Sequence, residues 1–275
     1  MRRLYYRLLF LLEAAAQIQI RTQNQNLLLS SVGEMSSSDV AGERWAALEA
    51  NPEVMTRLCH QVGVSPLYQV VDVWGLEPDL LAFVPQPAVS LILLFPSKNE
   101  KGERSREFLT VEKHEISEKV YYLRQLEGHL DNACGTIAMI HGILNNRDIL
   151  GVAGTDCVAE RFYKETQASS GEERGKLLDT YQEIVEVHNK LVTEGQSGVV
   201  EAGKVSHHFV CLTAVEGHLV ELDGAFNSGP NIIGKLGEDE TFLTAAAKFV
   251  QEKYIQQSGG NIQFALMALV MGQGD

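Results

Sequence analysis

The sequence is short of basic side chains. Lys and Arg together number 23 against 36 Asp and Glu, which gives a formal net charge of -13. An acidic surface repels phosphate backbones, so nucleic acid is a poor candidate partner. A basic ligand or a basic protein tail fits this charge better, although an excess of acid also serves solubility alone.

Cysteine is scarce as well. The chain has four cysteines, and no two of them are spaced as CxxC. None stands at metal-ligand spacing from a histidine, so we expect no metal site, and no organic cofactor is implied. Four cysteines in a chain of 275 residues do not resemble a disulfide framework, which favours a reducing, cytoplasmic location.

Long apolar runs and internal repeats are also lacking. The apolar stretch Leu8–Leu12 follows several arginines and resembles a signal or transit peptide, but it is too short to span a bilayer. A polar, Gln- and Asn-rich stretch, Gln17–Asn26, comes next. We therefore expect residues 1–42 to be a leader without packed structure, or sequence upstream of a start at Met35. Residues 43–275 are expected to form one domain, with no membrane segment.

What remains has the pattern of a single α/β core. The segment Ala88–Phe95 is continuously apolar, which predicts a central strand covered on both faces. Other strands are predicted near residues 68–74, 120–123, 209–215, 219–222 and 262–270. Helices are predicted near residues 52–61, 132–144, 159–167, 172–192 and 241–256. Helices surrounding a mostly buried sheet give an α/β fold of two or three layers.

Cys134 is the first candidate for chemistry. Asn132 is a plausible N-cap, which places Cys134 in the first turn of an apolar helix. The unpaired N–H groups and positive dipole end of that turn favour a thiolate, the reactive form of cysteine. Gly135 leaves room for a substrate, and the Cys134 amide can face an oxyanion. The competing interpretation is a small buried core cysteine.

A predicted hairpin supplies candidate partners. If Glu216 and Gly217 are its two turn residues, residue 210 faces Asp223 and His208 faces residue 225. His208 and Asp223 then share a face as a diagonal pair, with backbones roughly 7 Å apart, which their side chains can bridge. A carboxylate in that position fixes the tautomer of an imidazole and stabilises its cation. A slip of one residue in the register would break this arrangement.

Other histidines and cysteines compete for these roles. In the predicted register His207 points to the opposite face, and His218 lies at the turn. Cys211 lies within a strand, while Cys59 and Cys157 lie in helical stretches without a base nearby in the sequence. We interpret these three cysteines as packing residues.

Four segments carry a resemblance to a known family. The sequence resembles the ubiquitin C-terminal hydrolases from about Arg44 to Met271, above all in NACGTIAMIHGILNN (132–146) and HFVCLTAVEGHLVELDG (208–224), and also in RWAALEANPEV (44–54) and VVDVWGLEPDLL (70–81). The resemblance implies a papain-like α-β-α domain with a mostly antiparallel sheet and a knotted backbone. It also implies a thiol protease, or deubiquitinase, that acts as a monomer.

The same resemblance assigns roles. Cys134 would be the nucleophile, His208 the base and Asp223 its orienter. Small adducts or short peptides would leave the terminal glycine of ubiquitin through a thioester. The segment Thr193–Val205 would form a narrow arch over the site, since a short chain spans only roughly 3.3 Å per residue. Acidic residues would receive the basic tail of ubiquitin, namely Glu49, Glu53 and Asp72.

Two departures from the family pattern stand out. The oxyanion-hole glutamine lies six residues before the cysteine in the family, but the matching Gln125 lies nine before Cys134. Residues 126–131 (LEGHLD) therefore carry three extra residues, which either bulge outward or displace Gln125. After Asp223, residues 225–227 (AFN) replace an expected basic stretch. Alternatives are a ubiquitin-binding protein with impaired activity and a peptidase for another ubiquitin-like modifier.

Overall fold

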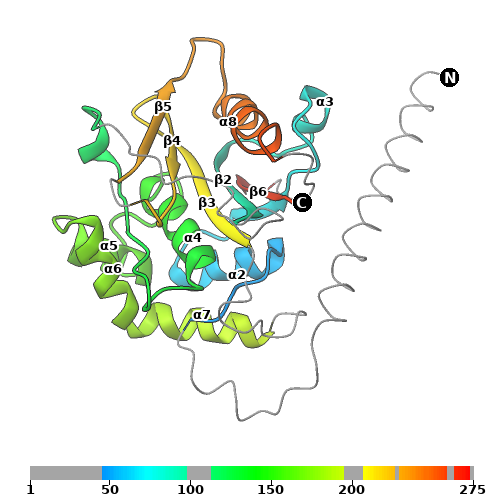
Figure 1. The fold of residues 1–275 in the computed structure, drawn as a ribbon. Coiled ribbons are helices and arrows are strands. Elements are labelled where there is room, and N and C mark those ends of the chain that lie inside the picture. The colour runs from blue at the N-terminus through cyan, green and yellow to red at the C-terminus, as the bar shows by residue number, and fades with distance from the viewer. Residues whose placement is uncertain (1–44, 98–112, 195–206, 227–228, 259–262, 273–275) are drawn as a thin grey trace.

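The computed structural model describes residues 45–97, 113–194, 207–226, 229–258 and 263–272, which form one sheet with helices on both faces (Figure 1). The sheet has six strands in the order β1-β6-β2-β3-β4-β5, and each neighbouring pair is antiparallel. The strands are β1 (Tyr68–Asp72), β2 (Ala88–Pro96), β3 (His207–Val215), β4 (His218–Leu222), β5 (Asn231–Lys235) and β6 (Ala265–Met271). The predicted α/β fold with an antiparallel sheet is confirmed.

The helices divide between the two faces of the sheet, as Figure 1 shows. One face is covered by α2 (Pro52–Val62), α4 (Cys134–Asn145), α5 (Val158–Thr166), α6 (Gly171–Thr180) and α7 (Gln182–Glu194). The other is covered by α8 (Phe242–Val250) and α3 (Pro78–Leu81). Two short helical segments are the 3₁₀ helix η2 (Ser117–Lys119) and the π-helix η3 (Gln251–Ile255), which continues α8. Among these described helices, none combines the length and the apolar character needed to cross a membrane.

The middle of the sheet is covered on both sides. Along β2, Leu91 and Leu93 pack towards α8, while Ile92 between them packs towards α4, and all three are fully buried. Such burial contributes on the order of 2 kcal/mol per side chain. The continuous apolar run therefore has the central position predicted for it, and it gives α4 a firm base.

Local signals explain how the covering helices begin and how closely they pack. The Asn51 side chain accepts a hydrogen bond of 2.9 Å from the Glu53 amide, so α2 starts at Pro52 as predicted. In α4, a Cβ added to Gly142 would come within 2.7 Å of Ser90 Oγ. Glycine therefore lets α4 lie directly on β2.

The predicted strand at residues 120–123 is wrong. The Tyr121 amide donates to Asn145 Oδ1 at 2.8 Å, and the Leu123 amide donates to His141 Nε2 at 2.9 Å. Side chains of α4 thus take the backbone groups that a neighbouring strand would otherwise pair with. The segment is extended, but it packs along α4 and does not pair with any strand of the described sheet.

The single helix predicted over residues 172–192 is also wrong. The chain is extended at Tyr181 (φ -75°, ψ 91°), which separates α6 from α7. The Tyr181 ring packs edge-on against Phe162 with centroids 5.0 Å apart. Helix α3 and strand β5 were not predicted at all.

Several predictions fall outside the described residues. These are the leader at 1–42 and the arch-forming part of Thr193–Val205, of which residues 193–194 end α7. The knotted path of the backbone stays a prediction.

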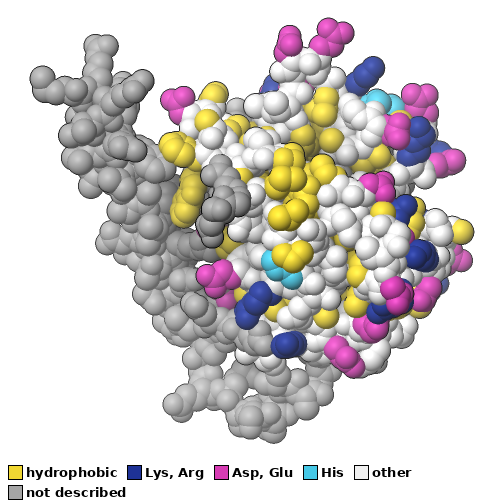
Figure 2. All heavy atoms as spheres, turned by 180° about the vertical axis from the view of Figure 1, so that it is seen from behind, with side chains coloured by type: hydrophobic (Ala, Val, Ile, Leu, Met, Phe, Trp, Pro, Cys, Tyr) yellow, Lys and Arg dark blue, Asp and Glu magenta, His cyan; other side chains and the backbone are white. Residues whose placement is uncertain are grey.

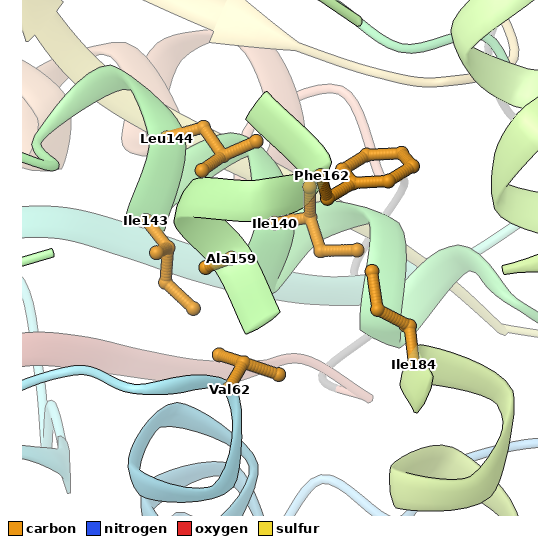
Figure 3. Close-up of a pocket in the computed structure, with 7 residues that line it drawn as sticks. All are labelled: Val62, Ile140, Ile143, Leu144, Ala159, Phe162 and Ile184. Atoms are coloured by element: carbon orange, nitrogen blue, oxygen red, sulfur yellow. The ribbon is translucent and has the colours of Figure 1, made fainter. Parts of the chain in front are cut away.

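A small apolar cavity lies between α2, α4, α5 and α7 (Figure 3). It has a volume of about 10 Å³ and is lined by apolar side chains, among them Phe162 and Ile184. It is far too small for a ligand, and its apolar lining offers no hydrogen-bond partner to an ordered water, so we look for the chemistry elsewhere. On the face shown in Figure 2, Asp and Glu are interspersed with Lys and Arg rather than gathered in a patch of one sign.

Candidate active site

Cys134 begins α4 at the end of the sheet where β3 starts. Ala133 takes the N-cap position without a side-chain hydrogen bond, so the predicted cap at Asn132 is wrong. A backbone turn sets the helix start instead, because the Ala133 amide donates to the Leu130 carbonyl at 3.0 Å. With no capping side chain, the N–H groups of the first turn stay available to negative charge at the sulfur or on a substrate.

The helix start is seated on β3 through a glycine. A Cβ on Gly135 would lie 3.3 Å from Leu48 Cβ and 3.3 Å from Phe209 Cδ2. Gly135 therefore serves close packing against the residue next to His208, and not the room for substrate that we expected of it. This contact holds the start of α4 against β3, and so keeps Cys134 near His208.

The hairpin has the register expected from the sequence. Cys211 pairs with Leu222 and Val215 pairs with His218, which leaves Glu216 and Gly217 as the turn. Both turn residues have positive φ, 49° and 72°, as a type I′ turn requires. The predicted pairing of β3 and β4 is confirmed.

The hairpin brings His208 and Asp223 together at its open end. His208 Nε2 lies 2.7 Å from Asp223 Oδ1, and both side chains are largely buried. Since Asp223 occupies Nε2, Nδ1 is the ring nitrogen left for Cys134. The Phe95 ring supports the imidazole edge-on, with centroids 5.8 Å apart.

Electrostatics favour a cationic His208. Burial alone would lower the pKa of His208, but the charge and hydrogen bond of Asp223, followed by those of the Cys134 side chain, raise it to about 10. The imidazole therefore holds a proton at neutral pH, and a cation beside Cys134 favours a thiolate.

The competing histidines are placed differently. Strand alternation turns His207 to the face of Phe209, away from the face of His208 and Phe95, and burial lowers the pKa of His207. His218 begins β4 beside the turn, where its Nδ1 lies 2.9 Å from the Glu216 carbonyl oxygen.

The other cysteines lack this environment. Cys59 and Cys211 are fully buried in the core. Burial raises the pKa of Cys59 to about 12 and also raises the pKa of Cys211. Cys157 is half-buried at the N-cap of α5. Among the four thiols, Cys134 is the one next to a cationic base.

Gln125 reaches the loop that leads to Cys134. Residues 127–129 are exposed while Leu130 returns to the core, so the three extra residues bulge outward. A positive φ of 77° at Gly128 and a 2.7 Å hydrogen bond from its amide to Asp131 Oδ1 close the turn. Gln125 Nε2 donates to the carbonyls of Leu130 at 2.8 Å and Asp131 at 2.9 Å.

These two bonds use both amide hydrogens of Gln125. Exchanging the amide nitrogen and oxygen would set the oxygen against two carbonyl oxygens, so the orientation is fixed. The other amide atom, Oε1, is buried without a hydrogen-bond partner in the described residues. In this structure, the Gln125 side chain therefore stabilises the loop that leads to Cys134.

The acidic residues predicted to receive substrate lie on or beside α2 and β1, two elements that are in contact. Thr56 Oγ1 of α2 accepts a hydrogen bond of 2.8 Å from the Val70 amide of β1. Glu53 lies three residues before Thr56 in α2, and Asp72 lies two residues after Val70, at the end of β1. Glu49 follows Leu48, the residue that packs against Gly135 at the start of α4.

Two residues at the site had no signal in the sequence analysis. Tyr122 lies in the segment predicted as a strand, and its hydroxyl donates to the Asp223 carbonyl at 2.8 Å. Gly224 follows Asp223, and a Cβ there would lie 3.0 Å from Ile137 Cγ2 and 3.2 Å from Gln125 Cβ. The close approach at Gly224 was detectable only once the neighbouring segments were placed.

Comparisons with known proteins agree on one family. The family model described as ubiquitin carboxyl-terminal hydrolase, family 1, matches residues 45–256. A Drosophila melanogaster ubiquitin carboxyl-terminal hydrolase is 38% identical over 232 residues, which cover 83% of this chain and 98% of the relative. The human isozyme L1 is 37% identical over 223 residues, which cover 81% and 96%.

A solved structure shares the fold. The catalytic domain of UCH37 from Trichinella spiralis, bound to ubiquitin vinyl methyl ester, has a TM-score of 0.66 and 23% identity. The match covers 86% of this chain and 99% of that domain.

Proposed function

The chain belongs to family 1 of the ubiquitin carboxyl-terminal hydrolases, and we propose that it uses Cys134 to release small adducts and short peptides from the C-terminal glycine of ubiquitin. The observation that carries this proposal is the 2.7 Å contact between His208 Nε2 and Asp223 Oδ1, beside a cysteine at a helix start. Ubiquitin as partner is supported by the names of the relatives and by the ubiquitin derivative bound to UCH37.

Acylation is the first half of the reaction. His208 already holds a proton, and the Cys134 sulfur attacks the carbonyl carbon of the terminal glycine as a thiolate. The resulting oxyanion is stabilised by the free N–H groups at the start of α4, including the Cys134 amide. His208 then protonates the leaving group, its bond to carbon breaks, and a thioester on Cys134 remains.

Deacylation reverses these roles. His208 takes a proton from water, which attacks the thioester carbonyl and releases the ubiquitin carboxylate. The Cys134 sulfur leaves as a thiolate, and His208 keeps the proton that it took from water. Throughout both halves, Asp223 keeps the imidazole oriented and stabilises its cation.

Gln125 is proposed as a second oxyanion donor, with a condition attached. Its two N–H groups are held by the carbonyls of Leu130 and Asp131, so one of these bonds must be exchanged for the bond to the oxyanion. The outward bulge at residues 127–129 gives the loop room to shift. If no exchange occurs, the protein binds ubiquitin but turns it over slowly.

We propose that two features select the substrate: acidic residues on the enzyme and narrow access to Cys134. Glu49, Glu53 and Asp72 would receive the basic tail of ubiquitin, since opposite charges steer partners together. Cys134 is only 6% exposed, which suits a thin, extended peptide tail rather than a folded surface. The proposed arch at Thr193–Val205 would restrict leaving groups further, and we expect the enzyme to act as a monomer in the cytoplasm.

Hydrolysis of ubiquitin that carries a C-terminal fluorescent leaving group tests this proposal. Wild-type protein is expected to release the fluorophore, while Cys134→Ala is expected to bind ubiquitin without turnover. The same assay on other ubiquitin-like modifiers separates a ubiquitin enzyme from a peptidase for another modifier. Equal turnover on several modifiers would contradict the assignment to ubiquitin.

A further inference from the structure

The Tyr122 hydroxyl lies against the turn that carries Asp223. It is 2.8 Å from the Asp223 carbonyl oxygen and also bonds the carbonyl oxygen of Phe226. Burial, followed by the negative charge of Asp223, raises the pKa of Tyr122. The hydroxyl therefore keeps its proton, and this one hydrogen is shared between the carbonyl oxygens at the two ends of the turn.

Tyr122 is itself held firmly. Its carbonyl accepts a 2.9 Å hydrogen bond from Arg174 Nη1, and its ring stacks on His141 at 5.4 Å with an interplanar angle of 15°. His141 is a residue of α4, the helix that Cys134 begins. The hydroxyl is thus fixed relative to the nucleophile helix.

The turn at residues 223–226 fixes the position of the Asp223 carboxylate. The Phe226 amide donates to the Asp223 carbonyl at 3.0 Å, and the Ala225 amide donates to Asp223 Oδ1 at 2.9 Å. That same oxygen bonds His208 Nε2. In a second contact, the backbone N–H of Gln125 donates to the Gly224 carbonyl at 2.7 Å, which joins the turn to the segment that contains Tyr122.

We propose that Tyr122 is a positioning residue for the hydrolase reaction: its hydroxyl fixes the turn 223–226 against α4, so that Asp223 holds His208 in line with Cys134. Tyr122 acts through Asp223 and contacts neither thiol nor substrate. The effect on turnover rests on the proposed function, whereas the effect on His208 does not.

The test is Tyr122→Phe, with Tyr121→Phe as matched control. Both tyrosines are buried, and the Tyr121 hydroxyl bonds Thr166 Oγ1 at 2.6 Å, away from the turn. Loss of one hydrogen bond at Tyr122 is expected to lower kcat about 5- to 10-fold with KM unchanged. A looser Asp223 also lowers the pKa of His208, because that pKa is raised chiefly by Asp223.

Titration of the His208 ring by NMR reads the second effect without ubiquitin, so it stands even if the proposed hydrolysis fails. The proposal requires a lower His208 pKa in Tyr122→Phe and wild-type behaviour in Tyr121→Phe. An unchanged His208 titration in Tyr122→Phe overturns it, whatever happens to kcat. Equal effects from both variants also overturn it, since they would reflect general loosening of the fold.

Discussion

Deletion of residues 127–129 tests whether this loop keeps the side-chain amide of Gln125 from donating to the oxyanion. These three residues are exposed, and their removal shortens the link between Gln125 and the two carbonyls that hold its amide. With only Leu126 left between Gln125 and Leu130, both bonds cannot keep their geometry. The deletion therefore frees the amide for the oxyanion.

The expected gain follows from the one bond that the parent protein must give up. A hydrogen bond contributes about 0.5–1.5 kcal/mol net, so freeing one N–H of the Gln125 side chain in the parent protein costs about that much. Removing that cost raises kcat about 2- to 13-fold. Because an oxyanion donor contributes about 100- to 1,000-fold, Gln125→Ala should cost that full factor in the deletion variant and less in the parent.

Steady-state rates on ubiquitin with a fluorescent leaving group measure all four proteins of this cycle. A matched control replaces Glu127 and His129 by serine, which keeps the loop length and Gly128 and should leave kcat unchanged. An unchanged rate on deletion, together with a loss of 100-fold or more for Gln125→Ala in the parent, would refute the withheld-amide mechanism.

Three further predictions follow from the site and the core. Cys134→Ala should abolish turnover while ubiquitin binding, measured by calorimetry, stays near wild type; lost binding would contradict a purely chemical role. His208→Ala should lower kcat about 100- to 10,000-fold and His207→Ala should not, so comparable losses would contradict the face assignment. Burial lowers the pKa of His141 and of His188 to about 4. Both must gain a proton on unfolding below pH 6.5, so each should remove on the order of 2 kcal/mol of stability by pH 5. A melting temperature that does not fall between pH 7 and pH 5 would contradict this.

The contact between His208 and Asp223 was predictable because the register of a hairpin determines which residues lie side by side. Once Glu216 and Gly217 are the turn, the period of two in a strand determines which side chains share a face. The pairing of His208 with Asp223 needed no information from distant segments. The central position of β2 was equally local, since a continuous apolar run must be buried on both faces.

The mistaken predictions involve distant partners. The residues at 120–123 have strand-like composition, yet Asn145 and His141 of α4 bond their backbone. The role of Tyr122 was hidden in the same way, because its hydroxyl meets a turn about 100 residues later in the chain. Local propensity cannot indicate such contacts.

The central claim is that Cys134 is the thiol that attacks the end of ubiquitin. Its most direct test is reaction of the purified protein with ubiquitin that carries a C-terminal electrophile, followed by intact-mass measurement and peptide mapping. The account predicts a single covalent adduct on Cys134 that is absent in Cys134→Ala. No adduct, or one mapped to Cys59, Cys157 or Cys211, would contradict it.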